Sequence, residues 1–204
     1  MPKIKVGIAG CLGRMGQELI KKILENKNFL FVGGFEHKSH PKIGKKMCDV
    51  TEIKSNKVIS NNAGLIFKEA DVVIDFTTPV STLSNVKFAS ATKTALVIGT
   101  TGLTNTQKAK IRGFSNKFPI LMSSNMSIGV NLLFDLVKQT ACSLHADEYD
   151  IEIAETHHKH KVDAPSGTAL SLGKYAALGR KTKIDKIKVL DRTKSLKKRK
   201  NGDI

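Results

Sequence analysis

Residues 4–16 read I-K-V-G-I-A-G-C-L-G-R-M-G, and this run sets the architecture of a chain of 204 residues. Its apolar residues alternate up to residue 9, which predicts a short β-strand. Three glycines follow with the spacing G-x-x-G-x-x-G, at Gly10, Gly13 and Gly16. Apolar residues then recur at helical spacing over 19–24, so a helix is expected directly after the glycines. This order is typical of a dinucleotide-binding site, because glycines let the backbone approach a pyrophosphate at the helix N-terminus.

Short apolar runs continue the pattern through the first half of the chain. They predict strands over 29–35, 72–74, 95–98 and 119–122. The runs over 72–74 and 95–98 are also rich in β-branched residues and bounded by turn residues. Helix-like stretches open near Pro79 and cover 105–117, with Gly113 as a weak point. Short buried strands that alternate with helices indicate an α/β fold with an N-terminal, Rossmann-type, doubly wound parallel sheet.

The pattern changes at Ser127, where a different kind of domain is expected to begin. Ile151 and Ile153 alternate with charged residues there, which predicts a strand with one wet face. A helix is expected over 127–144, followed by a strand over 148–155. A second helix that ends near 178 and a second strand over 187–190 follow. We therefore expect a dinucleotide-binding domain over 1–126 and a smaller α+β substrate-binding domain, incomplete at its C-terminus, over 127–204.

The residue that ends the second expected strand bears on the choice of cofactor. Glu36 lies 20 residues beyond Gly16, where an acidic side chain would accept hydrogen bonds from the adenosine ribose hydroxyls. His37 and Lys38 follow it and could partly offset a 2′-phosphate. We therefore expect use of NADH, with NADPH tolerated. Small and hydroxyl-bearing residues at two later strand ends, over 75–79 and 99–102, suit the nicotinamide ribose and carboxamide.

Residues 155–169 read E-T-H-H-K-H-K-V-D-A-P-S-G-T-A and carry the strongest chemical signal. Histidines at 157, 158 and 160 and two lysines stand directly before an apparent helix start. Helix N-terminal amides bind anions without titrating, and a histidine can deliver a proton near neutral pH. The run therefore predicts a site that binds carboxylates and donates protons, with Asp163 able to orient the cationic loop.

Composition excludes several other classes. The net charge is +16, but eleven Lys or Arg fall in one run between Arg180 and Lys200, and aromatic content is only 5%, so a nucleic-acid partner is not expected. Three scattered cysteines argue against disulfides and structural zinc, and they fit a reducing compartment. No apolar run is long enough to span a membrane, and no signal peptide is evident. We expect a cytoplasmic protein without a metal.

The chain closely resembles the 4-hydroxy-tetrahydrodipicolinate reductase (dihydrodipicolinate reductase) family of bacterial and plant lysine synthesis. The resemblance rests on A-G-C-L-G-R-M-G, D-F-T-T-P, V-I-G-T-T-G and E-T-H-H-K-H-K-V-D-A-P-S-G-T-A, in order over essentially the whole chain. It implies a two-domain enzyme of the diaminopimelate route that reduces a cyclic imine dicarboxylate with NADH or NADPH.

The resemblance also implies roles for particular residues. His157 and Lys161 would handle the proton, and His158, Gly167 and Thr168 would hold a substrate carboxylate. The cofactor contacts would be Gly10, Cys11, Leu12, Gly13, Arg14, Met15, Glu36, Gly99, Thr100, Thr101, Ser123, Ser124, Asn125 and Met126.

The chain departs from its relatives in three places. Thr78 and Met126 stand where some members carry Arg and Phe, and related proteins continue past Ile204 with parts that complete the substrate domain and much of a tetramer interface. We expect a homo-oligomer, a homotetramer where the full-length family chain is present. The alternative is a dinucleotide-binding protein of the same fold that lacks catalysis because of the shortened C-terminus. A semialdehyde dehydrogenase fits less well, since it would leave the histidine cluster idle.

Overall fold

A computed structural model describes residues 2–159, 161, 164–191 and 200–204. The chain divides into two compact units, Met1–Ser123 and Ser124–Ile204, which are described separately.

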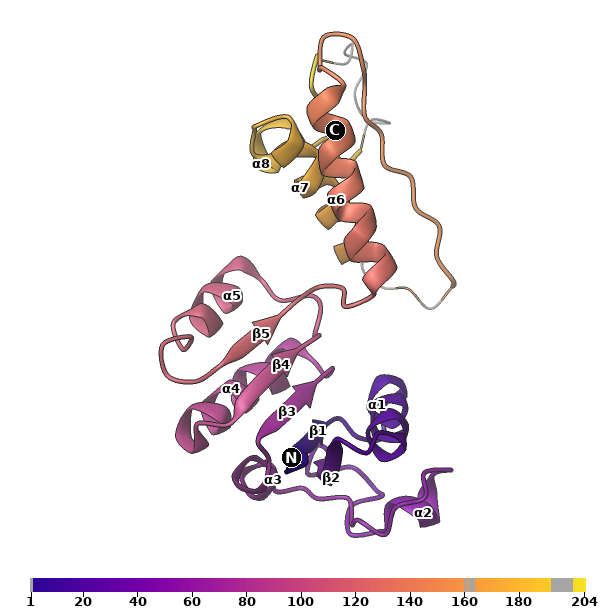
Figure 1. The fold of residues 1–204 in the computed structure, drawn as a ribbon, viewed down its shortest axis with the longest axis vertical. Helices are drawn as coiled ribbons and strands as arrows, with labels where there is room; N and C mark the ends of the chain where they lie inside the picture. Colours follow the sequence, from indigo (N-terminus) through magenta and orange to yellow (C-terminus); the bar gives the residue numbers. More distant parts are fainter. Residues whose placement is uncertain (1, 160, 162–163, 192–199) are drawn as a thin grey trace. The chain divides into compact units, whose positions relative to one another are not determined.

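The first unit is built on a five-stranded parallel sheet with the strand order β2-β1-β3-β4-β5 (Figure 1). Every pairing is parallel, with Ile8 opposite both Gly34 of β2 and Ile74 of β3. The order reverses direction at β1, so the carboxyl ends of β1 and β3 form the crevice where open α/β sheets bind ligands. The strands are β1 (Ile4–Ala9), β2 (Phe29–Phe35), β3 (Val72–Asp75), β4 (Ala95–Ile98) and β5 (Ile120–Met122).

Helices cover both faces of this sheet and produce two separate cores. One core joins α1 to Val6 and Ile8 of β1, and the other joins α3, α4 and α5 to Val73 and Leu96. The helices of this unit are α1 (Arg14–Glu25), α2 (Met47–Val50), α3 (Ala63–Glu69), α4 (Pro79–Thr92) and α5 (Asn105–Arg112). The expected α/β class and Rossmann-type parallel sheet are confirmed.

Two details of the first unit differ from expectation. Helix α5 ends at Arg112 rather than continuing to 117, because Gly113 forms its C-cap. Helices α2 and α3 were not expected, since each is too short to show a helical period in the sequence. Asn62 begins α3 by accepting a hydrogen bond from the backbone N–H of Leu65.

The described part of the second unit consists of helices and loops. Helices α6 (Ile128–Ser143) and α7 (Gly167–Gly179) pack closely, and Phe134 stacks on Tyr175 with ring centroids 5.1 Å apart. The two helices approach so closely at Gly179 that a Cβ there would lie 2.3 Å from the carbonyl oxygen of Lys138, which leaves room only for glycine. A short helix, α8 (Ile184–Ile187), follows. The small core of this unit centres on Ala141, Ala176, Ala177 and Ile204.

Two expected strands of the second unit are wrong. Residues 150–158 belong to no helix or strand, and part of the expected 187–190 strand is the end of α8. Ile151 and Ile153 instead pack against the small core beside α7. Alternation of apolar and charged residues arises whenever an extended segment buries one side, so packing on helices produces the same pattern as pairing in a sheet.

Candidate functional site

The glycine turn after β1 leaves the backbone bare at the start of α1. Gly10 has a φ of +66°, and the backbone N–H of Gly13 donates to the Gly10 carbonyl at 3.0 Å. A Cβ on Gly16 would lie 2.2 Å from the same carbonyl oxygen, so only glycine fits there. Gly13 begins α1 without a side-chain cap. No side chain of the described residues caps the first amides of α1, which leaves them available to a pyrophosphate.

Glu36 ties the end of β2 to this turn. Its Oε1 accepts a hydrogen bond from the backbone N–H of Leu12 at 2.7 Å. A carboxylate has a second oxygen, so Oε2 can still accept from a ribose hydroxyl. The residue thus lies where the sequence predicts it, with an additional task in holding the turn.

A groove of about 850 Å³ runs along the carboxyl ends of β1, β2 and β3. Its volume lies in the range of ligand pockets, about 300–1,000 Å³. Of the expected cofactor residues, Gly10, Leu12, Gly13 and Glu36 line it, together with His37 and Lys38. Arg14 and Met15 are exposed in the first turn of α1 but do not line the groove. The groove and the glycine turn together fit a dinucleotide.

Cys11 lies in the turn but is no reactive thiol. Burial, with a smaller contribution from the charge of Glu36, raises the pKa of Cys11 to about 12. A thiol with so high a pKa is not a nucleophile at neutral pH. Only its backbone can serve a ligand, because the side chain is fully buried.

A buried carboxylate organises the ends of β3 and β4. Asp75 is fully buried, and its Oδ1 accepts from the backbone N–H of Thr77 at 3.0 Å and from the Thr77 hydroxyl at 2.6 Å. Its Oδ2 accepts from Nδ2 of Asn85 on α4 at 2.9 Å. The hydroxyl of Thr82 donates to Oγ1 of Thr100 at 2.8 Å. Sequence reasoning missed Asn85 and Thr82, because they lie inside a helix far along the chain from their partners.

This network determines which of the residues that follow β4 can contact a ligand through a side chain. Thr100 is 6% exposed and uses its hydroxyl within the protein, whereas Thr101 is exposed. A Cβ on Gly99 would lie 2.1 Å from Cε1 of Phe76. Gly99 and Thr100 therefore shape the strand end, and Thr101 is the residue whose side chain is accessible to a ligand.

The segment before α6 lies against the start of α7. Nδ2 of Asn125 donates to Oγ1 of Thr168 at 3.3 Å, and the hydroxyls of Ser124 and Ser171 are 3.1 Å apart. A Cβ added to Gly167 would lie 3.8 Å from Cβ of Ser124. Ser124 and Asn125, which are expected to bind cofactor, thus adjoin Gly167 and Thr168, two of the three residues expected to hold a substrate carboxylate. Met126, the residue after Asn125 in the chain, is 38% exposed. Ser123 is the last residue of the first unit, and its backbone N–H donates to the Ile98 carbonyl at 3.1 Å.

The start of α7 is capped by a side chain that the sequence analysis did not single out. Ser166 is buried, and its Oγ accepts from the backbone N–H of Ala169 at 3.0 Å. Its own backbone N–H donates to Oε1 of Glu155 at 2.8 Å, and its hydroxyl donates to Oε2 of the same carboxylate. Nε2 of His157 lies 2.9 Å from this Oε2. Glu155 therefore joins the expected acid to the helix start.

These contacts favour the charged form of Glu155. Hydrogen bonds from the Ser166 hydroxyl and amide, followed by the one from His157, lower the pKa of Glu155 to about 2. The carboxylate is ionised over the whole physiological range, so it can only accept hydrogen bonds there.

Of the remaining loop residues, His158 is exposed, Lys161 is partly buried, and others lie outside the described residues. The backbone N–H of Lys161 donates to the His158 carbonyl at 3.1 Å. His157 and His158 are solvent-exposed, as a group that meets a soluble ligand must be. His160 and Asp163 lie outside the described residues.

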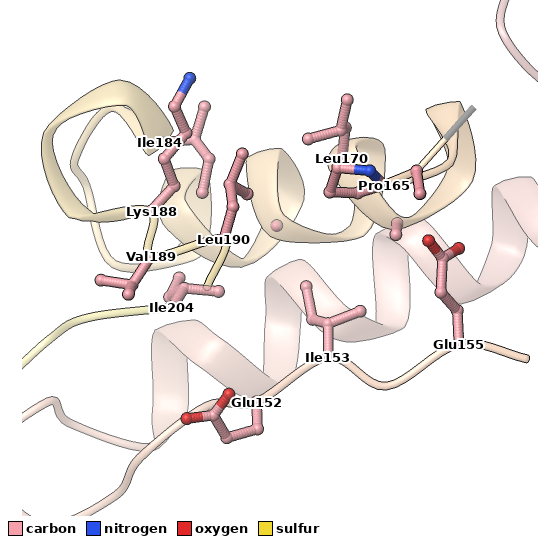
Figure 2. Close-up of a pocket in the computed structure, with 13 residues that line it drawn as sticks. Glu152, Ile153, Glu155, Pro165, Leu170, Ile184, Lys188, Val189, Leu190 and Ile204 are labelled. Carbon is pink, nitrogen blue, oxygen red and sulfur yellow. The ribbon is translucent and has the colours of Figure 1, made fainter. Parts of the chain in front are cut away.

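Glu155 also lines an apolar pocket of about 370 Å³ between the 152–155 segment, α7 and α8 (Figure 2). Aliphatic side chains dominate its wall, and its charged residues are Glu152, Glu155 and Lys188. None of His157, His158 and Lys161 lines it. Two carboxylates against one lysine make it unsuited to a dicarboxylate ligand.

Neither a metal site nor a membrane span emerges from the part of the chain that the structure describes. No three His, Cys, Asp or Glu side chains there gather closely enough to hold a metal ion. No helix among those residues is long and apolar enough to cross a bilayer.

Comparison with known proteins identifies one family along both halves. The family model described as dihydrodipicolinate reductase, N-terminus, matches residues 4–126, and the one described as dihydrodipicolinate reductase, C-terminus, matches residues 129–204. Proteins named 4-hydroxy-tetrahydrodipicolinate reductase from Pelagibacter ubique and Polynucleobacter necessarius are 47% and 40% identical over 88% and 98% of this chain. The chain spans 66% and 75% of their respective lengths.

A solved structure agrees. It is a dipicolinate-bound dihydrodipicolinate reductase from Paenisporosarcina sp. TG-14, with 30% sequence identity and a TM-score of 0.68. The match covers 87% of this chain and 67% of the other.

Proposed function

The chain belongs to the dihydrodipicolinate reductase family, and on that premise we propose that it reduces 4-hydroxy-tetrahydrodipicolinate to tetrahydrodipicolinate. The reaction belongs to the diaminopimelate route of lysine biosynthesis. The observation that carries the proposal is the arrangement in the second unit, where His157 is held by Glu155 directly beside the N-terminus of α7. A proton donor next to an anion-binding helix end suits a dicarboxylate that must gain a proton as it is reduced.

The two parts of the chain divide the work. Residues 1–126 bind the dinucleotide, and residues 127–204 bind the substrate and supply the acid. The bare glycine turn and the groove beside it support the first assignment. The histidine loop and the start of α7 support the second.

A nicotinamide cofactor fits the first unit. When bound, it supplies the hydride that adds to the substrate ring. The amides of the turn from Gly10 to Met15 would hold its pyrophosphate, and Glu36 would accept hydrogen bonds from its adenosine ribose. Thr101 at the end of β4 and the 123–126 segment complete the contacts. Gly99 and Thr100 contribute through their backbone, since the Thr100 side chain is buried.

Glu36 favours NADH over NADPH, because a carboxylate at the ribose repels a 2′-phosphate. His37 and Lys38 line the same groove and partly offset that repulsion. We expect NADH to be preferred and NADPH to be accepted.

The residues of the second unit donate the proton and bind the substrate carboxylate. One hydride and one proton are added to the ring. In the overall conversion the 4-hydroxyl also leaves as water, together with a hydrogen from the neighbouring ring carbon. His157 supplies the proton and Lys161 assists with its positive charge. His158 and the amides of Gly167 and Thr168 hold a carboxylate. The solved relative binds dipicolinate, a cyclic dicarboxylate, which supports a substrate of this class.

A spectrophotometric assay of NADH loss with freshly formed dihydrodipicolinate precursor tests the proposal. Reductase activity predicts substrate-dependent loss of NADH. His157→Gln should then lower kcat about 100-fold, the usual contribution of a general acid, while NADH affinity stays unchanged. Binding of NADH without any turnover would instead favour the non-catalytic alternative.

The setting of the protein is part of the same proposal. We expect a cytoplasmic enzyme that forms a homo-oligomer, a homotetramer where the full-length family chain is present. Sedimentation of the purified protein over a range of concentrations tests the oligomer.

A further inference from the structure

We propose that Glu155 is a positioning residue of this site, and that it makes Nδ1 the atom of His157 that gives up the proton. The inference rests on the proposed function, in which His157 is the acid. In this role Glu155 acts through the two residues that it contacts, His157 and Ser166.

The first step is the geometry of the carboxylate. Oε1 of Glu155 accepts from the Ser166 N–H at 2.8 Å, and Oε2 accepts from the Ser166 hydroxyl and lies 2.9 Å from Nε2 of His157. Figure 2 shows Glu155 reaching from its segment toward the start of α7, near Pro165. Both oxygens are engaged, so the carboxylate cannot rotate without breaking contacts on two sides.

Second, the contact with Glu155 determines which nitrogen of the His157 ring carries the hydrogen. An ionised carboxylate has no hydrogen to give, so Nε2 must be the donor in this contact. The neutral ring then carries its hydrogen on Nε2 and has Nδ1 as an acceptor. When the ring is protonated, the additional hydrogen sits on Nδ1, and this is the proton that it can transfer.

The third step links the acid to the carboxylate grip. The same Glu155 holds Ser166, whose hydroxyl oxygen caps the Ala169 N–H in the first turn of α7. Gly167 and Thr168, which would hold the substrate carboxylate, lie between these two residues. One carboxylate thus fixes the acid and the anion-binding turn to each other within the second unit, where orientation is worth large factors in rate.

Glu155→Gln separates this role from a merely structural one. The amide oxygen of Gln can still accept from the Ser166 N–H, but its NH₂ group must donate toward His157. We expect the neutral His157 ring to move its hydrogen to Nδ1, seen in ¹⁵N ring shifts of the unliganded protein. In the assay, kcat should fall about 100-fold. Release of the proton from Nδ1 would leave the neutral ring with its hydrogen on Nε2, the tautomer that the Gln side chain disfavours. NADH affinity should not change.

Glu148→Gln is the matched control. Glu148 is an exposed glutamate of the same connecting segment, and its substitution removes the same charge. It should leave the His157 tautomer and kcat at wild-type values. Far-ultraviolet circular dichroism of both variants establishes that they are folded.

The outcomes separate the two proposals. An unchanged tautomer in Glu155→Gln overturns the positioning role, and so does a wild-type kcat in that variant. If the wild-type protein shows no turnover, the proposed function fails, but the ring shifts still decide whether Glu155 sets the tautomer.

Discussion

Glu155 is a residue that the fold stabilises in its charged form. Its pKa lies at about 2, below the ordinary value of 4.5, because Ser166 and His157 donate hydrogen bonds to it. A carboxyl whose folded pKa is depressed stabilises the fold above the unfolded pKa. That contribution is lost as the pH falls through the folded pKa. The stabilising effect of Glu155 is therefore present at neutral pH and disappears between pH 4.5 and about 2.

Glu155→Gln should consequently lower the urea midpoint of the second unit at neutral pH, and the gap to wild type should close as the pH falls toward 2. Tyrosine fluorescence reports this transition selectively, since both tyrosines, Tyr149 and Tyr175, lie in the second unit. A gap of the same size at every pH would contradict the assignment.

Glu36 gives a second prediction about a single residue. Glu36→Gln keeps an oxygen that can accept from Leu12 N–H and removes only the charge. The preference for NADH over NADPH should fall about tenfold, because hydrogen bonds to a charged group contribute about 1.5–3 kcal/mol. Fluorescence titration with both cofactors measures it, with Glu69→Gln on the exposed surface of α3 as the control. Equal weakening of both cofactors would mean that Glu36 serves the turn alone.

The sequence contains the residue types of the site but not their pairings. The histidines and the S-G-T helix start are adjacent in the chain, so their chemistry can be read directly. The bond between Glu155 and Ser166 spans 11 residues and depends on how the loop folds back. The Asn85 contact to Asp75 likewise depends on where α4 crosses the sheet. No local pattern encodes such distances.

The glycine turn supplies the prediction for a whole element. In Gly16→Ala the new Cβ would lie 2.2 Å from the Gly10 carbonyl oxygen and 2.9 Å from Cα of Cys11. Both are backbone atoms, so α1 must shift away from the turn. We expect a loss of about 1–3 kcal/mol in the free energy of unfolding, and NADH binding too weak to saturate.

Gly129→Ala is the control for this prediction. The nearest atom to a Cβ there is Oγ of Ser127 at 4.0 Å, and Ala is the better helix former in α6. Thermal unfolding and NADH titration should find this variant at least as stable as wild type, with unchanged affinity. Wild-type NADH affinity in Gly16→Ala would remove the turn from the cofactor site.

A helix or strand could be predicted where its pattern of apolar residues is compatible with only one type of secondary structure. β2 and β4 occupy the expected residues, because each is a short apolar run, too short for an amphipathic helix. The segment 148–155 failed as a strand because Ile151 and Ile153 bury one side against helices. The four residues of α2 and the seven of α3 are too few to establish a period.

At the scale of the whole molecule, the charge matches the proposed ligands. The chain carries 34 basic against 18 acidic residues, a net charge of +16. Both a dinucleotide and a cyclic dicarboxylate are anions, and a positive surface raises their local concentration. The basic composition therefore needs no nucleic acid to account for it.

The most direct test of the whole account follows the hydrogen itself. The purified protein is given NADH deuterated at the transferred position, together with freshly formed 4-hydroxy-tetrahydrodipicolinate, and the product is analysed by mass spectrometry. The account predicts tetrahydrodipicolinate that carries the deuterium, formed much more slowly by His157→Gln. Product without deuterium, or bound NADH that is never consumed, would contradict it.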